Sequence, residues 1–272
     1  MKADTEKIIN VSIILISWKM KDLLKKCLES IYKFTDGICF EIILIDNNSL
    51  DGTSEMIKNE FPSIKLITNN RNKGVAPARN QGLKIAQGKY VLILDADMEL
   101  TENSLLQLYN FMESNKSCGL VGCKLVDTDL ALQYSCKRFP TITSLLSRRL
   151  EIFNFVKNSK TLNYHLMKDW NHKSIVEVDY VIGACQFFRK EIIDKIGYYD
   201  DKIFYGPEDL DFCLRIWRIG YKVCYYPLTS IIHYEQRITK KNLFSTISFK
   251  HFLGILYIFK KYNFSIKRQN NA

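Results

Sequence analysis

The stretch Tyr90-Val91-Leu92-Ile93-Leu94-Asp95-Ala96-Asp97 indicates how the chain folds. Its first five residues are unbroken and apolar, which is typical of a strand buried on both faces of a parallel sheet. Similar strands and intervening helical patterns precede it, with strands expected at 11–16, 41–45 and 64–67 and helices at 20–34, 53–60 and 74–86. This alternation predicts an α/β domain with a mostly parallel sheet and right-handed crossovers.

Polar side chains follow three of these strands, at Ser17-Trp18, Asp46-Asn47-Asn48 and Asp95-Ala96-Asp97. Ligands of α/β sheets bind at the carboxyl ends of the strands, so these side chains are expected on one rim. Two carboxylates spaced as Asp95 and Asp97 suit Mg²⁺ or Mn²⁺, which can bridge to a diphosphate. The alternative is a loop in which Asp95 caps the next helix. Asp46 is interpreted equally well as a turn and helix cap or as a ligand of a nucleobase or ribose.

The second half of the chain is less regular. The pattern predicts helices at 102–115 and 207–219, a strand and hairpin at 120–138, a variable loop at 150–175, a strand-like segment at 176–188 and short strands at 223–226 and 229–233. Proline at the start and glycine after the end support the helix at 207–219. We detect no internal repeat and no flexible linker.

Four further residues have both a structural and a chemical interpretation. Glu208 and Asp209 can stabilise a helix start through its dipole, or one of them can be a general base. Arg79 can be a solvated helix residue or a forked partner of a phosphate. His233 can be a structural histidine, or it can complete a metal shell with Asp97.

The charge of the chain is concentrated near its C-terminus. The 272 residues (31.8 kDa) carry a net charge of +10, yet no acidic residue follows Glu235, and the eight cations after it account for most of the excess. Aromatic and aliphatic residues alternate with these cations, which suits a basic amphipathic segment at a membrane surface. A C-terminal helix packed on the core with a solvated basic face is the equal alternative.

Composition and motifs exclude other classes. Disorder over most of the chain and a collagen-like repeat do not fit the composition. Uncharged runs are too short for a transmembrane helix, and the N-terminus lacks the pattern of a signal peptide. The eight cysteines form no C-x-x-C pair, so free thiols in a reducing cytosol are expected. Neither a P-loop nor a Rossmann glycine motif is present.

Taken together and in this order, the motifs resemble the family-2 glycosyltransferases of the inverting, metal-dependent GT-A type, closest to the rhamnosyltransferase-like branch that builds bacterial surface polysaccharide. The similarity extends from about residue 10 to about 235, and the blocks that carry it lie at 11–18, 45–53, 72–82, 94–97, 183–184, 206–215 and 220–233. One departure is Trp18-Lys19, where the family usually has Tyr-Asn.

The resemblance implies a role for each matching residue. A nucleotide-sugar donor, UDP- or dTDP-linked, would contact Ser17, Trp18, Asp46, Asn48, Arg79, Asp95, Ala96, Gly183 and Ala184. Mn²⁺ or Mg²⁺ would be held by Asp97, Asp95 and His233, and Asp209, with Glu208 beside it, would be the base. The implied acceptor is a glycan or a polyprenyl-diphosphate-linked glycan.

The expected organisation is a catalytic domain at 1–236, with a nucleotide-binding half (8–100) and an acceptor-binding half (101–236), followed by a basic segment at 237–272 that contacts membrane. The protein is expected in the cytoplasm, at the inner face of the cell membrane. Alternatives are a sugar nucleotidylyltransferase, which would normally have a glycine-rich loop in place of 17–21, and a non-catalytic carbohydrate- or membrane-binding protein. Nucleic-acid binding through the C-terminal segment is not expected, because the body shows no such motif.

Overall fold

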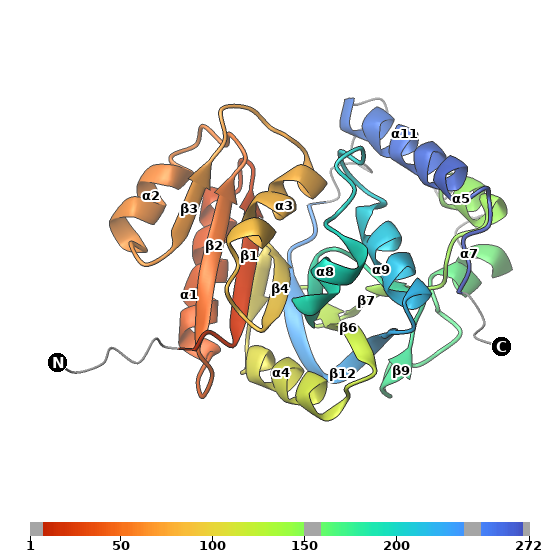
Figure 1. The fold of residues 1–272 in the computed structure, drawn as a ribbon, viewed down its shortest axis with the longest axis horizontal. Helices are drawn as coiled ribbons and strands as arrows, with labels where there is room; N and C mark the ends of the chain where they lie inside the picture. Colours follow the sequence, from red (N-terminus) through yellow and green to blue (C-terminus); the bar gives the residue numbers. More distant parts are fainter. Residues whose placement is uncertain (1–7, 150–158, 237–245, 269–272) are drawn as a thin grey trace.

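A computed structural model describes residues 8–149, 159–236 and 246–268 (Figure 1). Its N-terminal half alternates strands and helices as expected: β1 Val11–Ser17, α1 Lys21–Phe34, β2 Phe40–Asp46, α2 Thr53–Glu60, β3 Lys65–Thr68, α3 Val75–Ile85 and β4 Tyr90–Asp95. β1 pairs in parallel with both β2 and β4, and β2 pairs in parallel with β3. The four predicted strands therefore form one parallel block of the sheet.

The second half extends this sheet with strands of both directions. Its elements are β5 Met98–Leu100, α4 Ser104–Ser114, β6 Cys118–Val126, β7 Leu132–Gln133, β8 Cys136–Lys137, α5 Ile142–Arg149, α7 Lys160–His165, β9 Val176–Glu177, β10 Tyr180–Val181, β11 Cys185–Arg189, α8 Glu191–Ile196, α9 Glu208–Arg218, β12 Lys222–His233 and α11 Thr246–Lys261. The sheet order is β3-β2-β1-β4-β11-β6-β12-β5. β11 runs antiparallel to β4 and β6, whereas β12 is parallel to β6.

Two expectations for the second half were wrong in detail, whereas the strand-like segment 176–188 is confirmed as three short strands, β9, β10 and β11. The segment 150–175 is not a loop throughout, because α7 lies within it; its residues 150–158 lie outside the described residues. The two short strands after residue 222 are one strand, β12, whose register shifts between Tyr226 and Ser230. Pro227 lies in this irregularity, as expected for a residue that cannot donate to the strand ladder.

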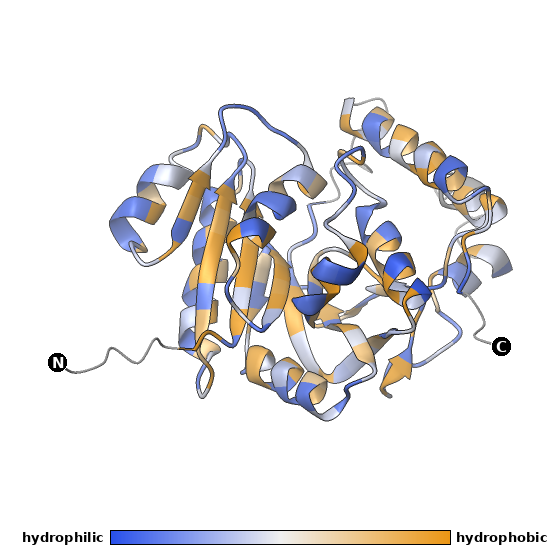
Figure 2. Ribbon diagram, in the orientation of Figure 1, coloured by the Kyte–Doolittle hydropathy of each residue, from blue (hydrophilic) through white to orange (hydrophobic). Residues whose placement is uncertain are grey.

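The central strands of the sheet consist mostly of hydrophobic residues (Figure 2), and their side chains form one cluster on each face of the sheet. One cluster joins the sheet to α1, α2 and α4, and the other joins it to α3, α8, α9 and α11. Apolar residues such as Ile13 and Ile14 point alternately into the two clusters. This explains why the central strands are continuously apolar rather than alternating.

The C-terminal helix α11 packs on the rest of the α/β domain. Ile258, Phe259 and Tyr262 are buried in the second cluster. Lys261 Nζ lies 2.7 Å from Asp211 Oδ1, and Tyr262 donates a 2.6 Å hydrogen bond to the same oxygen of α9. The inner face of α11 therefore follows the packed-helix alternative, although its outer face is not simply basic, as shown below. No helix in the described part of the chain is long and apolar enough to cross a membrane.

Candidate functional site

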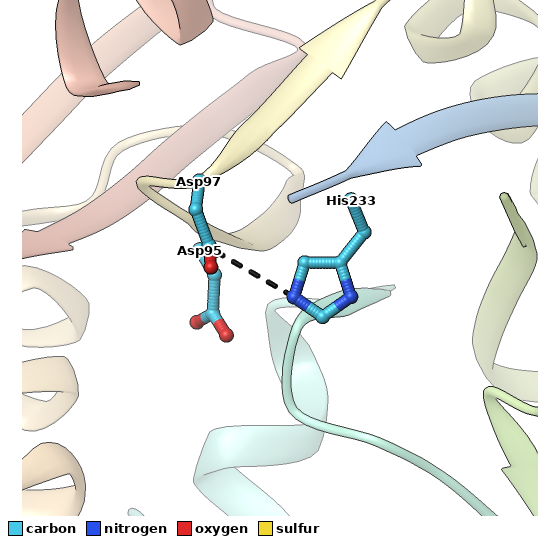
Figure 3. Close-up of side chains that lie close together, drawn as sticks. All are labelled: Asp95, Asp97 and His233. Atoms are coloured by element: carbon cyan, nitrogen blue, oxygen red, sulfur yellow. Dashed lines mark ion pairs between the residues drawn. The ribbon is translucent and has the colours of Figure 1, made fainter. Parts of the chain in front are cut away.

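Asp95, Asp97 and His233 come together at the end of β4 (Figure 3). A two-residue turn separates β4 from β5, and β5 pairs with the end of β12 so that Met98 lies opposite His233. The amide of Tyr234 donates to the carbonyl oxygen of Asp97 at 2.9 Å. Strand pairing thus fixes the histidine beside the carboxylates, whereas Asp95 caps no helix because a strand follows it.

The donor set of this cluster fits a divalent cation. One ligand atom from each of the three residues lies within 4.8 Å of the others, and His233 Nε2 is 3.6 Å from Asp97 Oδ1. Neighbouring ligands on one octahedral ion are about 3 Å apart, so small side-chain movements would suffice. Two carboxylates and an imidazole suit Mn²⁺, and Mg²⁺ less well because it favours oxygen ligands.

Gln133, which the sequence interpretation missed, determines how His233 presents its ring. Its Oε1 lies 2.8 Å from His233 Nδ1, and its Nε2 donates a 2.8 Å bond to the carbonyl oxygen of His233. The amide oxygen can only accept, so Nδ1 carries the proton and Nε2 keeps its lone pair toward Asp97. The pairing of β7 with β6 places Gln133 beside His233. The sequence around Gln133 shows no motif that would have indicated this.

Replacing Gln133 with Leu is expected to weaken Mn²⁺ binding by about tenfold, because outer partners that orient a ligating histidine typically contribute this much. The affinity can be measured by calorimetry or by the electron paramagnetic resonance signal of free Mn²⁺, with a nucleoside diphosphate present. Gln87→Leu, at an exposed glutamine, is the matched control. Equal Mn²⁺ affinity of wild type and Gln133→Leu would refute this role.

Arg79 is buried and connects the two acidic parts of the site. Its Nη2 lies 3.3 Å from Asp95 Oδ1, and its Nη1 lies 3.0 Å from Glu208 Oε1. Nη2 also donates a 2.8 Å bond to the carbonyl oxygen of Gly183. The neighbouring carboxylates outweigh burial and raise the pKa of the guanidinium. Its terminal nitrogens are thus directed at protein groups rather than presented as an open fork for a phosphate.

Gly183 and Ala184 lie at the junction of these groups. The Ala184 carbonyl accepts a 2.9 Å bond from the amide of Asp95, and the Gly183 amide donates a 3.1 Å bond to Asp209 Oδ2. A Cβ on Gly183 would lie 2.6 Å from Arg79 Nη1, which is closer than non-bonded atoms approach. Of the Gly-Ala pair expected from the sequence, Gly183 therefore leaves the space that the Arg79 guanidinium occupies.

Replacing Gly183 with Ala is expected to lower the free energy of unfolding by roughly 3 kcal/mol, because displacing Arg79 leaves buried charges unpaired. Chemical denaturation of the variant and the wild type measures this difference. If the effect is transmitted through Arg79, the double variant Gly183→Ala/Arg79→Met should be no less stable than Arg79→Met alone. Additive losses in the double variant would show that the clash lies elsewhere.

Asp209 and Glu208 occupy the first turn of α9 with different surroundings. Both carboxylate oxygens of Glu208 accept hydrogen bonds: Oε1 from Arg79, and Oε2 from the amide of Gly206 at 2.7 Å. Asp209 accepts backbone bonds from Gly183 and Leu210 and has no cation within ion-pair distance among the described residues. Burial first, and the charge of Glu208 second, raise the pKa of Asp209 to about 7. Asp209 is thus the better proton acceptor of the two near neutral pH.

At the ends of β1 and β2, the acidic residue Asp46 bonds to groups of its own turn and the following helix. Asp46 accepts bonds from the amide of Ser49 at 2.9 Å and from Ser54 Oγ at 2.5 Å, so the turn interpretation describes its contacts. Ser17 lies opposite Asp46 in the strand register, and its buried Oγ has no hydrogen-bond partner in the described part of the chain. Trp18 is half-buried, and the following Lys19 has a positive φ of 58°.

The remaining rim residues differ in their exposure. Asn48, with a positive φ of 67°, is half-buried on the loop after β2, and Ala96 is fully buried in the turn after β4. An open cavity of about 390 Å³ lies beside this rim and is lined by Arg71, Asn72, Lys73, Pro77 and Phe204. Phe204 joins the cavity from a distant part of the sequence, since its carbonyl accepts a 2.7 Å bond from the amide of Val75.

The mixed sheet with a carboxylate pair at the end of β4 agrees with the GT-A fold that the sequence resemblance implies. The model of glycosyl transferase family 2 matches residues 12–197, so the chain belongs to this family and is a glycosyltransferase.

Relatives and solved structures support this assignment. An uncharacterized glycosyltransferase of Methanocaldococcus jannaschii is 26% identical over 94% of this chain and 86% of its own length. An N-acetylglucosaminyl-diphospho-decaprenol L-rhamnosyltransferase of Mycobacterium tuberculosis is 23% identical over 77% of this chain and 71% of its own length. A mannosyltransferase from Pyrobaculum calidifontis, solved with GDP-Man and Mn²⁺, has the same fold (TM-score 0.64, 18% identity, 97% of this chain and 67% of that one).

Proposed function

We propose that this glycosyltransferase moves a sugar from a nucleotide diphosphate to a hydroxyl group with inversion, and that the reaction requires Mn²⁺ or Mg²⁺. The observation that carries the proposal is the chain of charges Asp95–Arg79–Glu208, which links the Asp95/Asp97/His233 cluster to Asp209. A cation-binding pole and a proton acceptor held rigidly together are what a single displacement at the anomeric carbon requires.

At the cation-binding end of the site, Asp95, Asp97 and His233 would hold the cation. The cation would neutralise the charge on the departing diphosphate. Ser17, Trp18, Asp46 and Asn48, with Ala96 behind them, would form the nucleoside side of the donor site. The buried Ser17 hydroxyl has no hydrogen-bond partner among the described residues, which supports this proposal, since a ribose or base could satisfy it. UDP or dTDP is the proposed nucleotide.

At the other end of the site, Asp209 would remove the proton from the acceptor hydroxyl as that oxygen attacks the sugar. Its two backbone hydrogen bonds fix the carboxylate, and its raised pKa suits a base that works near neutrality. Glu208 would hold Arg79 rather than accept the proton, and Gly183 and Ala184 would border the sugar. Residues 8–100 would thus supply most of the donor site, which His233 completes as a cation ligand, and 101–236 would supply the acceptor site.

The proposed acceptor is a glycan on a polyprenyl diphosphate, as in surface-polysaccharide synthesis. The support is the M. tuberculosis relative, whose name places its acceptor sugar on diphospho-decaprenol. Such an acceptor lies in a membrane, so the enzyme is proposed to work from the cytoplasm at the inner face of the cell membrane, with the segment 237–272 in contact with the lipid.

A panel of UDP-, dTDP- and GDP-sugars, assayed by calorimetry with Mn²⁺ and with EDTA, tests the donor proposal. At least one nucleotide sugar is expected to bind with Mn²⁺ and to lose most of its affinity in EDTA. Binding that is equal in both conditions would contradict the metal proposal. Pyrophosphate release from a nucleoside triphosphate and a sugar phosphate would instead indicate a nucleotidylyltransferase.

A further inference from the structure

The helix α11 has two apolar faces: one is buried against the protein, and the other is exposed in the part of the chain that the structure describes. Ser248, Gly254, Ile258 and Phe259 are buried on the inner face. The outer face exposes large apolar side chains within two turns: Phe249 (60%), Phe252 (37%), Leu253 (46%) and Leu256 (50%). Their spacing of three and four residues puts them on one stripe of the helix. A helix that only closed the core would carry polar side chains there.

The charges around this stripe have one sign. The helix contains Lys250, Lys260 and Lys261 and no acidic residue. Lys261 is paired with Asp200 and Asp211, whereas exposed Lys260 continues the apolar stripe one turn further and Lys250 flanks it over the ring of Phe204. The sequence adds Lys267 beyond the helix. An apolar stripe edged by lysines is complementary to a surface that is apolar inside and anionic outside.

A second copy of the chain is a poorer occupant. In a two-fold contact the same patch meets itself, so the lysines of both copies would approach one another with no acidic residue of α11 to offset them. Anionic lipid supplies the missing negative charge. Lysine stems can also extend toward headgroups while the rings and leucines enter the acyl boundary.

The helix also contacts the segment that leads to the proposed base. A Cβ on Gly254 would lie 3.1 Å from Pro207, and one on Gly206 would meet the ring of His251. Pro207 directly precedes Glu208 and Asp209 at the start of α9. A membrane against the outer face of α11 would therefore be held close to the acceptor side of the site.

We propose that the stripe Phe249, Phe252, Leu253 and Leu256, edged by Lys250 and Lys260, docks the enzyme on an anionic membrane surface. This inference narrows the membrane contact of the proposed function from residues 237–272 to one helix face. It places the stripe at the headgroup boundary and leaves the inner face of α11 on the protein.

Flotation of the full chain with lipid vesicles tests the docking. One set of vesicles consists of phosphatidylcholine alone, and the other also contains roughly 30 mol % of the anionic lipid phosphatidylglycerol. The wild type is expected to float with the anionic vesicles and much less with the neutral ones. Phe249→Gln/Leu253→Gln/Leu256→Gln is expected to lose about tenfold or more of this binding. The matched control is Leu50→Gln/Leu130→Gln/Leu228→Gln, three leucines that are exposed elsewhere on the protein.

Binding of nucleoside diphosphate and Mn²⁺ by the same variants separates this proposal from the proposed function. Retained nucleotide binding with lost flotation supports the docking surface and shows that the variant is folded. Flotation of the α11 variant equal to that of the wild type, or no flotation of the wild type, would overturn the docking surface without affecting the catalytic proposal. Dimers that dissociate in the α11 variant, with no lipid binding, would assign the stripe to a second copy.

Discussion

Asp209→Asn should lower kcat by about 10²- to 10⁴-fold while leaving donor affinity within a few-fold of the wild type, because a positioned general base contributes this much. The amide keeps the shape of the side chain and loses its basicity. The Gly183 amide donates to Oδ2 and the Leu210 amide to Oδ1, so the asparagine oxygen keeps one of these two bonds and the other is lost. Losing one hydrogen bond costs about 1–3 kcal/mol, which a domain of this size tolerates, so the variant should stay folded. Steady-state release of nucleoside diphosphate measures kcat, and calorimetry measures donor affinity.

Asp194→Asn is the matched control, because it makes the same chemical change at an exposed residue of α8. Its kcat should equal that of the wild type. Turnover of Asp209→Asn within a few-fold of the wild type would remove Asp209 from the role of base. Glu208 is no substitute, because Arg79 and the Gly206 amide already occupy its oxygens.

The pH dependence should follow the carboxyl group of Asp209. Burial and the charge of Glu208 raise its pKa to about 7, so the group is protonated, and inactive as a base, below that pH. The value of kcat/KM is expected to rise about tenfold per pH unit below pH 7 and to level off above it. A profile that is flat from pH 5 to pH 8 would contradict a base with this pKa.

Asp97→Ala should abolish the metal dependence of nucleotide binding. Asp97 is buried against His233, so its removal leaves Asp95 and an imidazole as the remaining donors. With the diphosphate present in both cases, two protein ligands hold a divalent ion far more weakly than three. Titration of the nucleotide in Mn²⁺ and in EDTA should therefore give the same weak affinity in the variant, whereas the wild type shows a large difference.

The fold of this variant should survive, because removing the buried Asp97 carboxylate also removes its repulsion with the neighbouring, half-exposed Asp95. Asp129→Ala, on an exposed turn, is the control that should keep the difference between Mn²⁺ and EDTA. A metal requirement that persists undiminished in Asp97→Ala would show that the cation is held elsewhere.

The parallel half of the sheet could be predicted because its strands are buried on both faces, so their apolar runs are continuous and end in polar residues such as Asp46 and Asp95. The second half could not be predicted as well. Strands of two or three residues, such as β5 and β7, are too short to show a period, and their pairing depends on partners far along the chain.

The same difference applies to the site. Residues at the ends of long strands were identifiable from the sequence, and the structure brings Asp95, Asp97 and His233 together. Gln133 was not identifiable, because a two-residue strand carries it. Arg79 was expected near a phosphate, but its buried contacts with Glu208 and Gly183 depend on tertiary packing that no local pattern encodes.

The stereochemistry of the reaction tests the central proposal most directly. Proton NMR of the sugar transferred from the best donor, recorded as the product forms, reports the configuration at its anomeric carbon. A single displacement assisted by Asp209 predicts a product whose anomeric configuration is opposite to that of the donor. A product that retains the configuration of the donor would contradict the mechanism.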